Sequence, residues 1–172
     1  MSENILKETN LDDGNGITSE TFNCFGCSPK NSGGLKLKFE KCGDTILAPV
    51  KIGKVYESFP GVVHGGIIAT ILDEVMAQVA FCLDHLPSMT VGLRIRYLQP
   101  MQVDKKYTSE AKVISRVDQT VEVEGRLKSE GEDNYIAVAK GTFFIVSPDY
   151  LLSDKLRLPR ETYQSFSNFV SS

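Results

Sequence analysis

The segment from Ser58 to Gly66 reads Ser-Phe-Pro-Gly-Val-Val-His-Gly-Gly and leads directly into a long apolar stretch with helical periodicity. The first turn of a helix exposes backbone N–H groups that have no intrahelical partner and carry a positive partial charge. Gly65 and Gly66 bring no side chain, so a carbonyl oxygen can approach these groups closely. Such an oxyanion hole stabilises negative charge on a carbonyl oxygen under attack. The alternative is that the glycines only permit a tight turn into the helix.

Two acidic residues interrupt the apolar stretch. Asp73 comes nine residues after His64 and shares a predicted helix face with mostly small side chains. A carboxylate on such a face is costly to bury unless it is paired or reached by solvent through a pocket. Glu74 lies about 100° further round the helix. For Asp73 the choice between a pocket and plain exposure stays open, whereas Glu74 is expected to face solvent or a neighbouring subunit.

The cysteines are a possible source of metal or redox chemistry, and they stand at positions 24, 27, 42 and 82. Cys24 and Cys27 form a Cys-x-x-Cys pair in a loop rich in turn-forming residues. A zinc site usually takes four ligands, commonly from two such pairs. Here Cys42 is the candidate third ligand, and only a strained histidine, His64 or His85, could be the fourth. We therefore expect reduced thiols, no metal, and a loop that packs as a lid.

A buried helix is predicted from Gly66 to Leu83, because apolar residues recur at helical spacing and no proline interrupts them. Its surface is apolar or small almost all round, which is typical of a helix that other elements enclose. Four β-rich segments follow and can enclose it, at residues 90–98, 106–117, 120–129 and 135–147. Short connections between these segments favour an antiparallel meander.

A hairpin is predicted before the helix. Leu35, Leu37 and Phe39 alternate with charged residues, which indicates a half-buried strand, and Asp44–Ile52 is its expected partner. Residues 42–44 would form the turn. The pattern therefore predicts an α+β fold in which an antiparallel sheet of two plus four strands packs on one helix.

Composition narrows the class of protein. The chain has 172 residues, of which 41% are hydrophobic and 24% are charged, and this composition fits one globular domain. We expect this domain at residues 21–148, after an N-terminal arm at 1–20. A C-terminal tail at 149–172 follows and could hold a short helix. The net charge is −3 and no basic run occurs, which argues against nucleic acid or a membrane surface as a partner. No apolar run is long enough to span a membrane, and the polar N-terminus has no apolar signal core. We expect a cytoplasmic protein.

The motifs above resemble those of a known family. His64-Gly65-Gly66 with Asp73 is similar to the phenylacetic-acid-pathway (PaaI-like) type of hotdog acyl-CoA thioesterase, and the ending Tyr97-x-x-Pro100 fits the same family. The Cys-Phe-Gly-Cys segment resembles a motif of one subgroup. The resemblance covers roughly residues 24–147 and implies a hotdog fold, in which the sheet wraps around a central helix. It also implies homodimers, often paired again as homotetramers.

The resemblance assigns roles residue by residue. Asp73 matches the acid that acts as nucleophile or general base, Gly65 matches the oxyanion-hole N–H, and His64 matches the histidine that holds the carbonyl or orders the loop. Thr90 falls where relatives carry a hydroxyl that positions water. Relatives often carry Asn six residues before the histidine, where this chain has Ser58.

The implied activity is hydrolysis of an acyl-CoA to the free acid and CoA, without cofactor, at a site that two subunits share. Gly66 would contribute to substrate binding at the helix start. Arg94 and Arg96 lie two apart on one predicted strand, so they share a face and could hold the phosphates of CoA; the alternative is a merely solvated sheet face.

Two other functions are alternatives to hydrolysis. The first alternative is a non-catalytic sensor that binds acyl-thioesters. A hotdog dehydratase is disfavoured, because those enzymes carry a catalytic histidine directly before Phe-Pro-Gly and this chain has Ser58 there.

Overall fold

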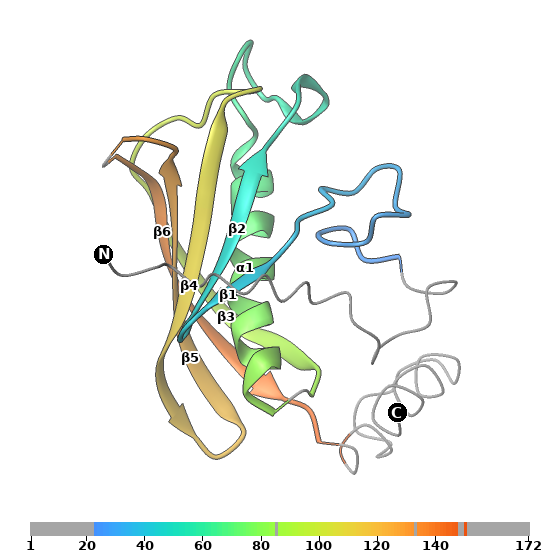
Figure 1. The fold of residues 1–172 in the computed structure, drawn as a ribbon, viewed down its shortest axis with the longest axis vertical. Helices are drawn as coiled ribbons and strands as arrows, with labels where there is room; N and C mark the ends of the chain where they lie inside the picture. The colour runs from blue at the N-terminus through green and yellow to red at the C-terminus, as the bar shows by residue number, and fades with distance from the viewer. Residues whose placement is uncertain (1–22, 85, 133, 148–149, 151–172) are drawn as a thin grey trace, which may run out of the picture.

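The computed structural model describes residues 23–84, 86–132, 134–147 and 150 (Figure 1). The elements in chain order are β1 (Glu40–Cys42), β2 (Thr45–Lys51), the 3₁₀ turn η1 (Lys54–Tyr56), α1 (Gly65–Asp84), β3 (Ser88–Tyr97), β4 (Lys106–Val117), β5 (Thr120–Ser129) and β6 (Tyr135–Ile145). The predicted order of two strands, one long helix and four strands is confirmed. The expected arm at 1–20 and the short helix expected in the tail lie outside the described residues.

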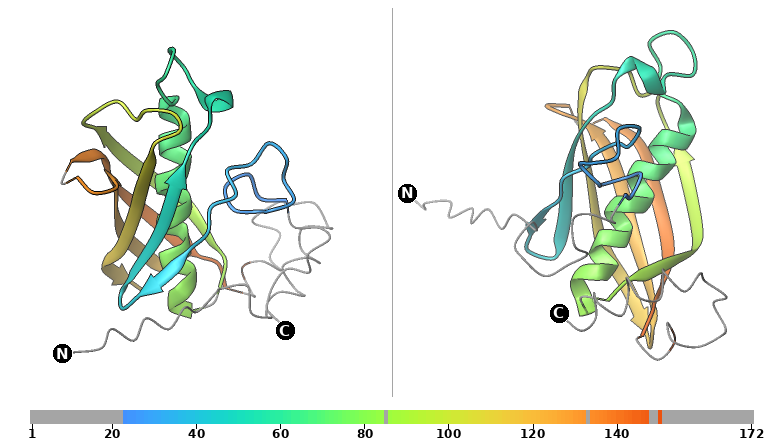
Figure 2. Two further views of the ribbon diagram at one scale, coloured as in Figure 1. Left: turned by 45° about the horizontal axis from the view of Figure 1, so that its top comes forward. Right: turned by 90° about the vertical axis from the view of Figure 1, so that its right-hand side faces the viewer.

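All six strands form a single antiparallel sheet in the order β1-β2-β4-β5-β6-β3. The helix α1 lies along one face of this sheet and contacts five of the strands, β2 to β6 (Figures 1 and 2). The connection through the helix places β3 beside β6, at the opposite end of the sheet from β1. This is the α+β hotdog architecture expected from the resemblance.

The helix packs closely because two glycines of the sheet lie beneath it. A Cβ at Gly125 would lie 3.0 Å from Cγ of Met76, and one at Gly141 would lie 3.2 Å from Cε of Met76. Met76 is fully buried between helix and sheet. A larger residue at Gly125 would meet Met76 and one at Gly141 would first meet the ring of Phe143 at 2.6 Å, so either would disturb the close packing of the core.

The sheet covers one face of α1, and this face carries the buried side chains Ile68, Ile71, Leu72, Val75, Met76, Val79 and Ala80. Other helix residues, among them Ala69, Asp73 and Ala77, are only half-buried. The prediction of a helix enclosed on nearly all sides is therefore wrong for a single chain.

With a mean hydropathy of 1.7 over an 18-residue window, α1 could cross a membrane by length and composition alone, yet here it packs as a core helix.

The predicted strand at residues 35–39 does not form. Lys36 adopts a positive φ of 55°, which breaks the extended ladder, and only Glu40–Cys42 pair with β2. The backbone N–H groups of Leu35 and Leu37 donate instead to the carbonyls of Phe25 and Gly26, at 2.8 and 2.9 Å. This segment therefore anchors the Cys-x-x-Cys loop rather than extending the sheet.

The strand β3 is an edge strand with an irregular start. It pairs with β6 on one side, and the pairing shifts register between Thr90 and Gly92. No described residue pairs with its other side, along which Val91, Tyr97 and their neighbours remain exposed. A ten-residue edge with exposed apolar side chains is a surface suited to pairing with another strand.

Candidate active site

The segment predicted to form an oxyanion hole lies at the start of α1. Gly66 donates its backbone N–H to Nδ1 of His64 at 2.9 Å, and the Tyr97 hydroxyl donates to the carbonyl of Gly65 at 3.0 Å. A Cβ at Gly66 would lie 3.0 Å from the same Nδ1 atom, so glycine lets the imidazole fold back over the turn. Among the described residues, no group accepts the Gly65 N–H. The turn thus orders His64 and leaves one helix N-terminal donor available to a ligand.

Asp73 lies two turns further along α1 and faces the edge of the sheet. The hydroxyl of Thr90 on β3 donates to Oδ1 of Asp73 at 2.9 Å. Burial raises the pKa of the half-buried Asp73 carboxyl, and the bond from Thr90 opposes this shift. Of the predicted site residues, the structure therefore brings Asp73 and Thr90 together.

The helix start and Asp73 do not meet within one chain. Eight residues separate Gly65 from Asp73, which corresponds to about 12 Å along a helix that rises 1.5 Å per residue. A bound carbonyl carbon must lie about 3 Å from both the attacking group and its oxyanion donor. A single chain therefore presents both halves of such a site without joining them.

Arg94 and Arg96 occupy the face of the sheet that points away from the helix. Their strand neighbour Ile95 packs against the core, and alternation along β3 directs the two arginines to the other side. Both are exposed, and neither forms an ion pair within the described part of the chain. The sheet separates them from Asp73 in the same chain.

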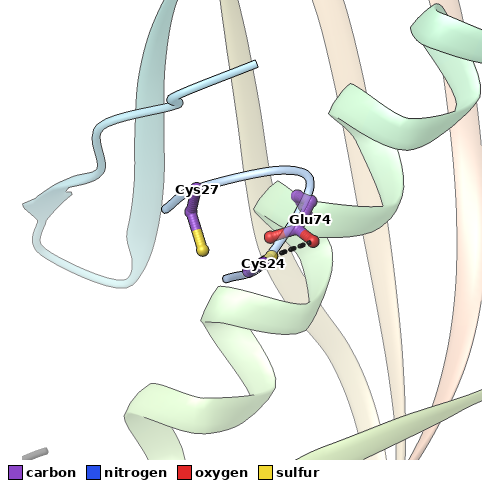
Figure 3. Close-up of side chains that lie close together, drawn as sticks. All are labelled: Cys24, Cys27 and Glu74. Atoms are coloured by element: carbon purple, nitrogen blue, oxygen red, sulfur yellow. Dashed lines mark hydrogen bonds between the residues drawn. The ribbon is translucent and has the colours of Figure 1, made fainter. Parts of the chain in front are cut away.

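Glu74 occupies a position that its place in the sequence did not indicate. This carboxyl is half-buried beneath the N-terminal loop, where Sγ of Cys24 donates to its Oε1 at 3.2 Å (Figure 3). The expectation that Glu74 faces solvent or another subunit is wrong, because residues 50 positions earlier cover it. Such a contact between distant segments leaves no periodic signal in the sequence.

The carboxyl group of Glu74 and the thiols of Cys24 and Cys27 shift one another's pKa values. Burial is the main cause that raises the pKa of Glu74 to about 8. The hydrogen bond between the thiols lowers the pKa of Cys24 and raises that of Cys27. Cys42, which the sequence analysis offered as a third zinc ligand, is exposed on β1 and does not belong to this group.

Comparisons with known proteins show what this chain is similar to. The thioesterase superfamily model matches residues 60–136, which include the helix start, Asp73, Thr90 and both arginines. Mouse acyl-coenzyme A thioesterase 13 is 22% identical over 97 residues, covering 51% of this chain and 69% of the relative.

Solved structures show the same fold. A thioesterase superfamily protein is 24% identical with a TM-score of 0.64, and the match covers 70% of this chain and 62% of that one, less than two thirds of its length. A protein from Bacillus halodurans, determined with CoA, is 25% identical with a TM-score of 0.59, over 66% of this chain and 76% of that one. The chain thus has the hotdog fold, and its residues 60–136 are similar to the thioesterase superfamily and distantly to acyl-coenzyme A thioesterase 13.

Proposed function

We propose that the protein hydrolyses an acyl-CoA thioester to the free acid and CoA. The observation that carries this proposal is the Asp73 carboxylate, held by Thr90 at the open edge of the sheet on a helix whose first turn offers the Gly65 N–H. The match to the thioesterase superfamily and the CoA named with the Bacillus halodurans structure support the same substrate class.

The site is proposed to form between two copies of the chain. The separation of about 12 Å between Gly65 and Asp73 is too large for one thioester carbonyl to contact both. The free edge of β3 and the half-buried side of α1 offer surfaces that a second copy can cover. In this dimer, Asp73 of one copy faces Gly65 of the other; a further pairing of dimers gives the homotetramer that the resemblance implies.

The chemistry follows from these positions. The thioester oxygen accepts the Gly65 N–H, and His64 orders the turn beside it. Asp73 takes a proton from water, the water oxygen bonds to the carbonyl carbon, and the C–S bond then breaks as the CoA sulfur leaves and is protonated. In the alternative route, Asp73 itself attacks the carbonyl carbon, the C–S bond breaks to release CoA, and water then hydrolyses the acyl anhydride to the free acid and the Asp73 carboxylate. The raised pKa of Asp73 makes its carboxylate a stronger base in either route.

The nucleotide end of CoA is proposed to contact Arg94 and Arg96. Both guanidinium groups lack an ion-pair partner among the described residues, whereas Arg126 and Lys112 on the same outer face pair with Glu124. Unpaired cations at the sheet edge can bind phosphate without first breaking an internal ion pair. Because these arginines lie on the opposite face from Asp73 of their own chain, this contact also requires a site at the boundary between copies.

A panel of acyl-CoA substrates tests the proposal, with release of free CoA thiol as the readout. Turnover of at least one acyl-CoA, lost in Asp73→Asn, supports hydrolysis. Binding of acyl-CoA without turnover across the panel would instead favour the sensor function. Absence of both binding and turnover would contradict the proposed substrate class.

A further inference from the structure

The loop around Cys24 and Cys27 has an arrangement that hydrolysis does not use. Sγ of Cys24, Sγ of Cys27 and a carboxylate oxygen of Glu74 all lie within 4.8 Å of one another (Figure 3). We propose that these three side chains bind one Zn²⁺ ion, which fastens the loop at residues 23–34 to α1. No metal was expected from the sequence, because the chain has no second Cys-x-x-Cys pair and only a strained histidine could follow Cys42 as a fourth ligand; the fold supplies Glu74 in place of Cys42.

The distances suit a single ion. Zinc binds thiolate sulfur at about 2.3 Å and carboxylate oxygen at about 2.0–2.2 Å, so ligand atoms around a tetrahedral ion lie roughly 3.5–4 Å apart. Sγ of Cys24 and Oε1 of Glu74 are separated by 3.2 Å. All three donor atoms lie within 4.8 Å of one another, so side-chain shifts of about 1 Å or less bring them to the spacing of a tetrahedral ion, with the fourth position left for water.

The donor types favour zinc among the common divalent ions. Two sulfur ligands exclude calcium and magnesium, which prefer sites made only of oxygen, while a mixed sulfur and oxygen set is one that zinc accepts. Within the described ranges, no lysine, arginine or histidine forms an ion pair with Glu74. Zinc bound here would displace the proton of this half-buried carboxyl group, which has no positively charged partner among the described residues.

The loop backbone holds the ligands in place before any ion binds. Gly26 donates its N–H to Sγ of Cys24 at 3.3 Å, an outer hydrogen bond of the kind that orients metal ligands. A Cβ at Gly26 would lie 2.2 Å from Cδ of Glu74, so only glycine lets the loop close over the carboxyl group. The carbonyls of Phe25 and Gly26 accept the N–H groups of Leu35 and Leu37, which ties the other side of the loop.

A second anchor fixes the far end of the same loop. The Tyr56 hydroxyl donates to the carbonyls of Gly33 and Gly34, at 2.6 and 3.1 Å. The loop is therefore attached near its start by the ligand cluster and at its far end by the hydrogen bonds from Tyr56. This zinc site is independent of the proposed hydrolysis, since Glu74 points away from Thr90 and Asp73 does not belong to the cluster.

Metal uptake by the full chain tests the site directly. The reduced protein is freed of metal with a chelator and titrated with Zn²⁺ against a chromophoric competitor. The expected result is one equivalent of zinc per chain, and Co²⁺ in its place should give a thiolate-to-cobalt charge-transfer absorption. Cys24→Ser and Cys27→Ser should each lose both signals. Cys42→Ser is the matched control and should keep them, because that thiol is exposed outside the cluster.

Folding is checked independently of metal binding. Circular dichroism should show that the serine variants remain folded, and amide exchange at residues 24–37 should slow on zinc addition in the wild type only. Failure of the wild type to take up one equivalent, or equal uptake by Cys24→Ser and Cys27→Ser, would overturn the proposal. Formation of a Cys24–Cys27 disulfide in a glutathione buffer that contains zinc would also overturn it and identify a redox pair.

Discussion

The hydroxyl of Thr90 donates to Oδ1 of Asp73 at 2.9 Å and so joins the sheet edge to the middle of the central helix. The bond fixes the orientation of a half-buried carboxylate whose pKa burial raises. It leaves the second carboxylate oxygen available to accept a proton. The proposed hydrolysis depends on this pair, and two of the predictions below test it.

Replacing Asp73 by Asn should lower kcat for the best acyl-CoA by about 10²–10⁴, the range expected when a general base is lost. The amide keeps the shape of the side chain and can still accept from Thr90, so the melting temperature should change little. Asp118→Asn makes the same chemical change on an exposed hairpin and serves as the control. Activity of Asp73→Asn within threefold of the control would remove Asp73 from the mechanism.

Replacing Thr90 by Val should reduce kcat by roughly tenfold or more, because a hydrogen bond to a charged group contributes about 1.5–3 kcal/mol. The side chains have a similar shape, so packing against β6 is preserved. Thr90→Ser retains the hydroxyl and should recover most of the activity. If the Val and Ser variants have equal kcat, the bond to Asp73 has no part in catalysis.

A site shared between copies predicts complementation between two inactive variants. Asp73→Asn lacks the base, and Gly66→Val places a side chain against His64 at the helix start, where a Cβ would already lie 3.0 Å from Nδ1. Co-expression with different tags allows the mixed dimer to be purified. The purified mixed dimer holds one intact site of two, so it should recover about half of wild-type activity, whereas the unpurified statistical mixture should recover about a quarter.

The pure variants are the controls for this experiment. Each should form a dimer in sedimentation while remaining nearly inactive. No recovery in the purified mixed dimer, or full activity in a 19.0 kDa wild-type monomer, would locate the whole site within one chain.

Reversing the charge of Arg96 to Glu should raise KM for acyl-CoA by roughly 3- to 10-fold, the scale of exposed ionic contacts. Hydrolysis of a short thioester without the nucleotide should hardly change. Lys112→Glu makes the same charge change on the outer face of β4, where the lysine pairs with Glu124 at 3.1 Å, and should leave KM unaltered. Equal losses on both substrates would indicate a folding defect instead of a phosphate contact.

Local patterns in the sequence determined most of the architecture. Helical spacing of apolar residues predicted α1 nearly to its ends, and alternation with short turns predicted β4 and β5 at their observed bounds. The position of His64 and the glycines at the helix start could also be predicted, because a turn and the helix that follows it depend on neighbouring residues. These features follow from interactions close in the chain, which periodicity and turn-forming residues record.

Only the tertiary structure decided which side chains meet. Strict alternation along β3 would place Thr90 on the same face as Arg94 and Arg96; the register shift after Thr90 turns it toward the helix and Asp73 instead. The positive φ of Lys36 likewise replaced an expected strand with an anchor for the cysteine loop. Glu74 then met Cys24 across 50 residues of sequence. Such contacts depend on how the whole chain folds back on itself. The periodicity of apolar residues, two in a strand and 3.6 in a helix, therefore does not predict them.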